Sequence, residues 1–250
     1  MGSRLGERVE SSRGAPRCTR IVPFFDDHSA DCIIVCDVDL FFVGDLSDLL
    51  GSWRFRAPPN NGSVPPPHVL QSVLAASGLG RPYRPGMAVI HRANTIRETH
   101  INNISGGVVV APAARSKELA LIWKKWAEWL VQHEALLGPS AFHIYQVSFA
   151  LAMEELREDV EFLPPQVNTV LHILPEIASV RAFHLTPGHI PQYPQRFNSD
   201  KTMNADGLEP GVSQAIGRLN DCIREAVTTI ASLPSTKDHL DKFLNPQWRR

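Results

Sequence analysis

Apolar residues along this chain fall into short runs and into stripes with helical spacing. Residues 32–42 are apolar and rich in β-branched side chains except at Asp37 and Asp39, which predicts a strand buried on both faces. A glycine pair leads into a second strand at residues 105–111, and a third strand runs through residues 180–188. Buried strands of this kind are typical of an α/β fold with a mixed, mainly parallel sheet flanked by helices.

Three further segments have apolar residues at the spacing of a helix that buries one face. The first begins near Ser116, which is the expected N-cap. The second covers residues 142–156, with Gln146 in its opening turns, and the third covers residues 212–232, where Pro234 ends it. The expected inward positions are Leu119, Ile122, Trp123, Trp126 and Leu130, then Val147, Ala150 and Leu151, then Ile216, Leu219, Ile223, Val227 and Ile230.

Breaks in these patterns divide the chain. Residues 57–68 contain five prolines, which predicts a surface loop that lies over the functional site. The first 20 residues are polar and without periodicity, as in a flexible terminus. We therefore expect a flexible amino terminus at residues 1–20, an α/β domain at residues 21–200 and a helical segment at residues 201–250.

Composition excludes several classes of protein. The chain has 250 residues, 43% hydrophobic content and a formal charge of −1, without the basic clusters of a nucleic-acid-binding face. It has no run of about 20 apolar residues to span a membrane and no apolar signal-peptide core, so we expect a soluble, cytoplasmic protein. Its four cysteines are too few for a disulfide scaffold, and we expect Cys32 and Cys36 to be reduced and in the core.

Asp37 and Asp39 are the strongest candidates for chemistry, because they end the first predicted strand. Side chains at positions i and i+2 of an extended strand point the same way, so the two carboxylates can converge on one cation. Carboxylate oxygens favour magnesium, manganese or calcium. An isolated Asp-x-Asp can also simply end a strand and begin a turn, so both interpretations stay open from these residues alone.

The order of several motifs resembles that of the GT-A glycosyltransferases. The branch that it resembles most is the retaining, glycogenin-like and lipopolysaccharide-galactosyltransferase-like one, over about residues 20–200. The motifs are Asp37-Val-Asp39, Ser105-Gly-Gly-Val, the tryptophan-rich helix, Tyr145-Gln146 at the next helix, and Asn168 followed by His184.

The resemblance implies a metal-dependent catalytic domain of the GT-A type. Asp37, Asp39 and His184 would bind manganese or magnesium, and Asp37, Asp39 and Gln146 would act in catalysis. Only 36 residues precede Asp37, so the implied fold is incomplete at its amino end, where the family builds much of its nucleotide pocket. The implied activity is that of a hexosyltransferase-like enzyme.

The resemblance also implies a sugar site. Ser105, Gly106, Gly107 and Gln146 would line it, and the donor would be a nucleotide-diphosphate sugar, with a UDP-sugar favoured and the acceptor unknown. The glycine pair also indicates either a backbone that something approaches closely or a simple turn. Tyr145 stands where the family usually has an aspartate before the glutamine.

Two other functions remain as alternatives. A strand that ends in Asp-x-Asp also opens the haloacid-dehalogenase-like phosphatases, although the residues after Asp39, Leu-Phe-Phe-Val, fit that family poorly. A truncated or degenerate transferase-like domain could bind a nucleotide sugar without turnover, which Tyr145 supports. Phosphatase activity without nucleotide-sugar binding would indicate the first alternative, and binding without transfer would indicate the second.

Overall fold

The structure is a computed structural model, and it describes most of the chain between residues 21 and 231. The predicted flexible terminus, Pro234 and the part of the third predicted strand that follows His184 lie outside the described residues. The described residues are 21–26, 28–37, 39–50, 53–60, 64–90, 95–170, 180–184, 198, 202–207 and 210–231.

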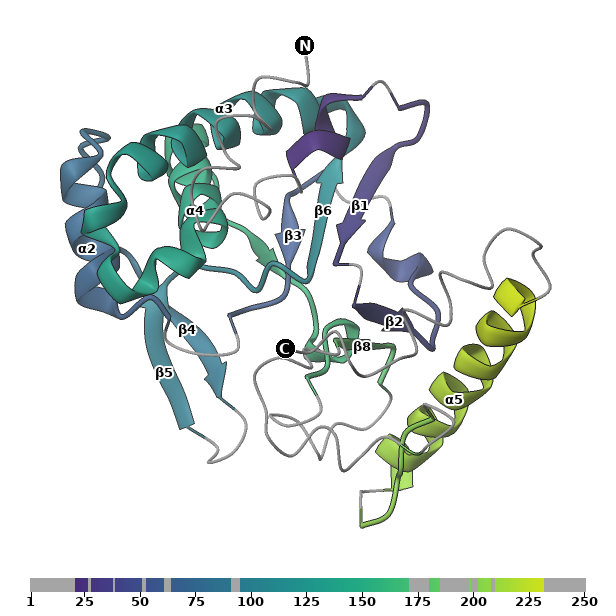
Figure 1. Cartoon of the computed structure of the whole chain (residues 1–250). Helices are drawn as coiled ribbons and strands as arrows, with labels where there is room; N and C mark the ends of the chain where they lie inside the picture. Colours follow the sequence, from purple (N-terminus) through teal and green to yellow (C-terminus); the bar gives the residue numbers. More distant parts are fainter. Residues whose placement is uncertain are drawn as a thin grey trace.

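The central sheet has four strands in the order β1-β6-β3-β7 (Figure 1). The strands β1 (Cys32–Cys36) and β3 (Arg56–Ala57) run antiparallel to β6 (Val108–Pro112), while β7 (Glu161–Phe162) is parallel to β3. The fold is α/β with a mixed sheet, but the expectation of a mainly parallel sheet is wrong for the described strands. The chain leaves β1 at the end of the sheet where it later enters β6, so these two strands must run in opposite directions.

The helices α2 (Pro67–Ala76), α3 (Ala113–Gln132) and α4 (Ile144–Leu156) lie on one side of this sheet (Figure 1). Two smaller strand pairs lie beyond its end: β2 (Leu40–Phe42) with β8 (Ala182–His184), and β4 (Pro85–Ile90) with β5 (Thr95–His100). Neither α2 nor the hairpin of β4 and β5 was expected from the sequence, and α2 begins inside the predicted proline-rich loop, where a proline suits the first turn of a helix. The remaining elements are α5 (Pro210–Ala231) and the short 3-10 helices Ser47–Leu49, Glu134–Leu136, Gly138–His143 and Pro165–Val167.

The strand buried on both faces is β6 rather than β1. All five residues of β6 are buried, whereas in β1 only Ile33 is buried. One face of β6 packs into the large core under α3 and α4, and the other packs into a smaller core with β2 and β8. Because β1 has a single neighbour among the described strands, its cysteines are not fully buried: Cys32 is half-buried and packs against the smaller core, whereas Cys36 is exposed, so the expected core position is wrong for Cys36.

The helix α3 begins four residues earlier than expected, with Pro112 and not Ser116 at its N-cap position. It starts directly after Pro112, and the Ser116 hydroxyl donates a hydrogen bond to the Ala113 carbonyl inside the helix instead of capping it. As predicted, Trp123 is fully buried, and its indole N–H bonds the Ser148 hydroxyl at 3.0 Å. This contact joins α3 to α4 over the sheet. None of the described helices is both long and apolar enough to cross a lipid bilayer.

The carboxyl-terminal helix α5 packs against the β2–β8 pair. Its residues Val212, Ile216 and Leu219 form a separate small core with Val180 and Phe183. The predicted amphipathic pattern of this segment is therefore confirmed for its first half, where burial of one apolar face holds the helix in place.

A buried ion-pair network ties the β4–β5 hairpin to the end of α4. The Glu154 carboxylate is fully buried and pairs with the guanidinium groups of Arg84 and Arg81, the latter at 3.2 Å. It also accepts a hydrogen bond from the Asn102 amide at 2.9 Å, and the His100 imidazole lies 3.5 Å away. The hairpin is thus held to the rest of the fold by charge as well as by packing.

His100 predicts how the fold responds to acid. Burial lowers the pKa of this imidazole to about 4, despite the nearby Glu154 carboxylate, and its Nδ1 accepts the Asn102 backbone N–H at 3.2 Å. The unfolded chain takes up the proton near pH 6.5 and the folded chain only near pH 4. Stability therefore falls, by about 1.4 kcal/mol per pH unit, as the pH drops through this window.

Denaturant melts of the wild type and of His100→Gln at several pH values between 7 and 4 measure this contribution. The variant has no group to protonate at this position, so we expect it to lose less stability over the window than the wild type. Equal slopes for the two proteins would contradict the assignment.

Candidate metal centre

Asp37 lies at the end of β1, where the backbone of the next strand holds it. Its N–H donates to the Gly107 carbonyl at 2.9 Å, and its own carbonyl accepts the N–H of Leu40 at 3.2 Å. The second of these bonds closes a turn between β1 and β2. Asp37 and Asp39 are therefore in this turn, not on one extended strand, and the expected reason for their convergence is wrong: the turn brings the carboxylates together.

His184 reaches the same turn from a distant part of the chain. It ends β8, whose pairing with β2 places it opposite Leu40, and its N–H donates to the Thr169 carbonyl at 2.9 Å. Its Nε2 lies 3.4 Å from Asp37 Oδ2 and 3.3 Å from Asp39 Oδ1. One ligand atom from each of the three side chains falls within 4.8 Å of the others.

The two aspartates change the pKa of His184. Burial alone would lower the pKa of His184, but hydrogen bonds and charge from Asp37 and Asp39 outweigh it and raise the pKa to about 9. In the metal-free protein the imidazolium thus occupies the position between the carboxylates near neutral pH. A cation that binds here takes the place of that proton.

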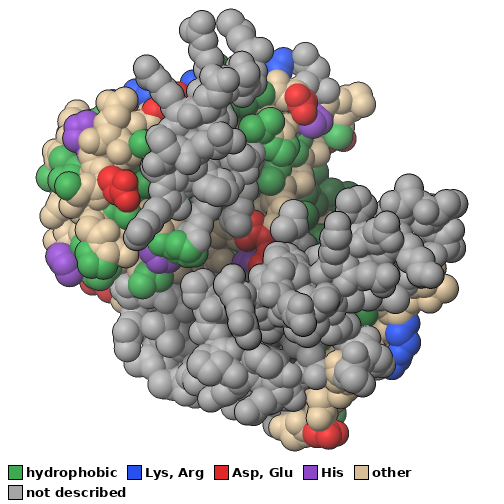
Figure 2. Space-filling model, in the orientation of Figure 1, with side chains coloured by type: hydrophobic (Ala, Val, Ile, Leu, Met, Phe, Trp, Pro, Cys, Tyr) green, Lys and Arg blue, Asp and Glu red, His purple; other side chains and the backbone are tan. Residues whose placement is uncertain are grey.

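This donor set fits a divalent cation. Two carboxylates and one imidazole suit manganese or magnesium, and Asp37 and His184 are buried while Asp39 is half-exposed, so the cluster reaches the surface on the side of Asp39. Acidic and histidine side chains meet near the centre of the face shown in Figure 2. The geometry brings together the three residues that the resemblance implies as metal ligands.

Asn168 stands behind His184. Its Oδ1 lies 3.0 Å from His184 Nδ1, and its amide nitrogen donates to the Ser105 hydroxyl at 2.8 Å. Gly107 leaves the space for this pair: a Cβ there would lie 2.3 Å from Asn168 Oδ1 and 2.9 Å from His184 Nδ1. The glycine thus permits the close approach that the sequence indicated, and the approaching groups belong to the protein itself.

Of the residues implied as sugar-binding, Ser105 and Gly107 contact the cluster or its supporting residues, while Gly106 and Gln146 contact residues outside the cluster. The Gly106 carbonyl is 3.5 Å from the Tyr145 hydroxyl, and the Gln146 amide oxygen is 2.6 Å from His143 Nδ1. The Tyr145 ring is buried and packs on Trp123, with ring centroids 4.8 Å apart. Gln146 is half-buried and is not a member of the Asp-Asp-His group.

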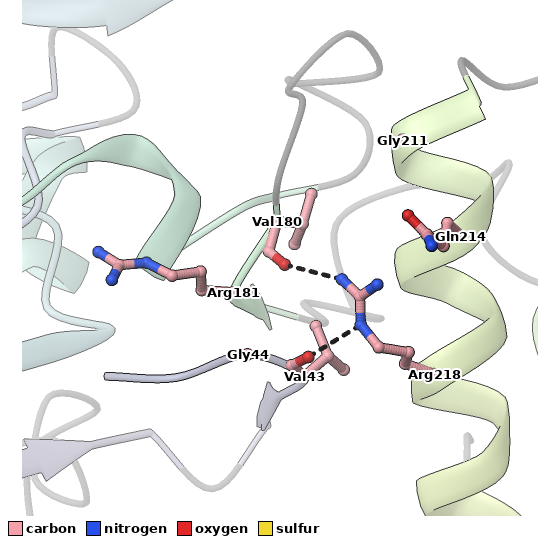
Figure 3. A pocket seen from close by; sticks show the side chains of 7 residues that line it. All are labelled: Val43, Gly44, Val180, Arg181, Gly211, Gln214 and Arg218. Atoms are coloured by element: carbon pink, nitrogen blue, oxygen red, sulfur yellow. Dashed lines mark hydrogen bonds between the residues drawn. The ribbon is translucent and has the colours of Figure 1, made fainter. Parts of the chain in front are cut away.

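A cavity of about 460 Å³ lies elsewhere, between the β2–β8 pair and the start of α5. Arg218 extends from α5 across it and donates to the carbonyls of Val43, at 2.9 Å, and Val180, at 3.3 Å (Figure 3). The Arg181 guanidinium points away from Arg218 in this view and pairs with Asp48. These bonds support the β2–β8 pair, which carries His184. The cavity is therefore lined by residues next to these strands and not by Asp37, Asp39 or His184.

Comparison with protein-family models and with curated proteins finds no match. The functional argument therefore depends on the geometry of the site.

Sequence reasoning missed the role of Asn168. The residue was noted only as part of an ordered set of motifs, because nothing in the sequence places an amide after Pro164-Pro165 next to a particular histidine. The contact depends on a parallel bridge between Thr169 and Phe183, which sets residues 168 and 184 side by side. Such pairings between distant segments leave no local pattern.

Proposed function

We propose that this protein is a metal-dependent glycosyltransferase that moves a sugar, a hexose by resemblance, from a nucleotide-diphosphate sugar to an acceptor, with a UDP-sugar as the favoured donor. The observation that carries the proposal is the convergence of Asp37, Asp39 and His184 from two distant segments onto one point. Two aspartates alone would be compatible with a turn. A buried histidine that faces both of them is the donor set expected of a cation site.

In this proposal, Asp37, Asp39 and His184 hold manganese or magnesium. The cation supplies charge stabilisation for the diphosphate leaving group when the bond to the anomeric carbon breaks. By resemblance, the backbone at Gly106 and Gly107 would line the sugar site, while Asn168 and His184 fill the space where a Gly107 side chain would lie. Ser105 and Gln146 complete the proposed sugar site, and the acceptor hydroxyl forms the new bond to the anomeric carbon as it loses its proton.

A second candidate is a domain that binds the nucleotide sugar without transferring it. Tyr145 favours it, because a buried aromatic ring stands where the resembling family has an acidic residue that contacts sugar or acceptor. The metal cluster serves binding in both cases. The two candidates differ in turnover alone.

Calorimetry with UDP, in the presence of manganese and in the presence of EDTA, tests the proposal. We expect binding with manganese that EDTA abolishes. Incubation with UDP-sugars then separates the candidates, since an enzyme releases UDP by transfer or slow hydrolysis and a binding domain does not. The absence of manganese-dependent UDP binding would overturn both, and phosphate release from phosphate esters without UDP binding would indicate a phosphatase.

A further inference from the structure

Asn168 is almost completely buried directly behind the candidate metal centre, with 1% of its surface exposed. Its side chain bridges Ser105 and His184, and it belongs to neither the aspartate turn nor β8. A buried amide must satisfy both its donor and its acceptor groups. The contacts with Ser105 and His184 therefore determine the hydrogen-bonding role of the Asn168 side chain.

In the structure the two ends of the Asn168 amide face different partners. Because the Asn168 nitrogen donates to the Ser105 oxygen at 2.8 Å, the amide oxygen is directed at His184 Nδ1. An amide oxygen accepts hydrogen bonds and does not donate them, so Nδ1 must carry a proton. A cation that replaces the proton on the other nitrogen would then meet the lone pair of Nε2, which faces Asp37 and Asp39.

The backbone holds the two residues in register. The Thr169 N–H donates to Ala182 and the His184 N–H donates to Thr169, both at 2.9 Å, so residue 168 lies beside the end of β8. Gly107 packs against both side chains so closely that a methyl group would collide with each. The imidazole has little room to rotate or to exchange its two nitrogens.

We propose that Asn168 is a positioning residue that keeps the His184 proton on Nδ1 and directs Nε2 at the space shared with Asp37 and Asp39. The inference depends on the proposed function only for the identity of the ligand, a divalent cation that Nε2 would bind. A partner that orients a metal-binding histidine contributes about 10- to 100-fold in metal affinity. Asn168 acts through His184 and does not itself touch the cation.

Two measurements on Asn168→Leu test this role. By electron paramagnetic resonance titration, we expect its dissociation constant for manganese to rise about 10- to 100-fold. By nitrogen NMR of the metal-free protein at neutral pH, we expect a His184 Nδ1–H signal that is protected from solvent exchange in the wild type, and loss of that protection in the variant, which has no acceptor for this proton. Asn168→Asp keeps an acceptor at this position and is expected to keep both the Nδ1 proton and manganese affinity within a few-fold of wild type.

Asn103→Leu is the matched control, because Asn103 is also fully buried and hydrogen-bonded but serves Val64 and Thr99. We expect it to lower stability and to leave manganese affinity unchanged. Unchanged protection of the His184 Nδ1–H in Asn168→Leu, or equal losses of affinity in both leucine variants, would overturn the proposal. If the wild type binds no manganese, the proposed function fails, and the Nδ1–H signal of the metal-free protein still decides the role of Asn168.

Discussion

Replacing Asp39 by asparagine is expected to weaken manganese binding by about 100-fold or more and to abolish manganese-dependent binding of UDP. The change keeps the size of the side chain but removes one of the two negative charges that face His184. Loss of a direct ligand should cost at least as much as the 10- to 100-fold typical of residues behind the ligands. Calorimetric titrations with manganese, and with UDP at saturating manganese, measure both effects.

The fold should tolerate this substitution. Asp39 is half-exposed, and Asp37 remains to pair with the imidazolium, so we expect the free energy of unfolding of the metal-free variant to change by less than about 1 kcal/mol. Asp48→Asn is the matched control, since Asp48 is also ion-paired, to Arg181, but lies outside the cluster. Unchanged manganese affinity in Asp39→Asn would contradict the assignment of the metal centre, and so would an equal loss in Asp48→Asn.

Replacing Glu154 by glutamine is expected to destabilise the fold by about 3 kcal/mol, the largest stability effect that we predict for a single substitution in this chain. The carboxylate is completely buried and receives Arg81, Arg84 and Asn102. The neutral amide leaves two partly buried guanidinium groups without this counter-charge, and its own N–H groups face donors. Urea denaturation of both proteins gives the difference in unfolding free energy.

Glu128→Gln controls for the loss of a helical glutamate. Glu128 is about half-exposed and pairs with Lys124 one turn earlier on α3, a geometry worth less than about 0.5 kcal/mol. Similar losses in the two variants would show that the Glu154 network contributes no more than a surface ion pair. Because Glu154 lies outside the metal cluster, manganese affinity of the folded variant is expected to match that of the wild type.

The sequence was most informative where local pattern decides structure. The pattern of apolar residues predicted three elements: the strand before Asp37, the tryptophan-rich helix and the amphipathic start of α5. Each of these elements forms because it buries its own apolar residues, which lie close together in the sequence. The position of His184 beside the aspartates came from a family resemblance and could not be derived from spacing. The pairing of β8 with β2 joins segments too distant for any local pattern to indicate.

The wrong prediction of strand direction and the missed hairpin have the same physical cause: the sequence does not show which strands pair. The direction of β6 relative to β1 depends on where the intervening chain re-enters the sheet, and an apolar strand has the same composition in either direction. The hairpin of β4 and β5 escaped notice because its second strand, from Thr95 to His100, mixes charged and apolar residues. The attachment of this hairpin to the fold depends on Glu154. This charged residue lies in α4, whose other buried residues are mostly apolar, so nothing in the sequence indicated an ion-pair network.

The antiparallel return of the chain beside β1 also bears on how such a protein can evolve. The hydrogen bond from Asp37 to Gly107 joins the beginning and the end of a long excursion, which carries α2 and the β4–β5 hairpin. Insertions or deletions around α2 or the β4–β5 hairpin can be absorbed away from the carboxylates, since both ends of the excursion are fixed at the same end of two neighbouring strands. Selection could therefore remodel the surface around the site while the Asp-Asp-His cluster keeps its geometry.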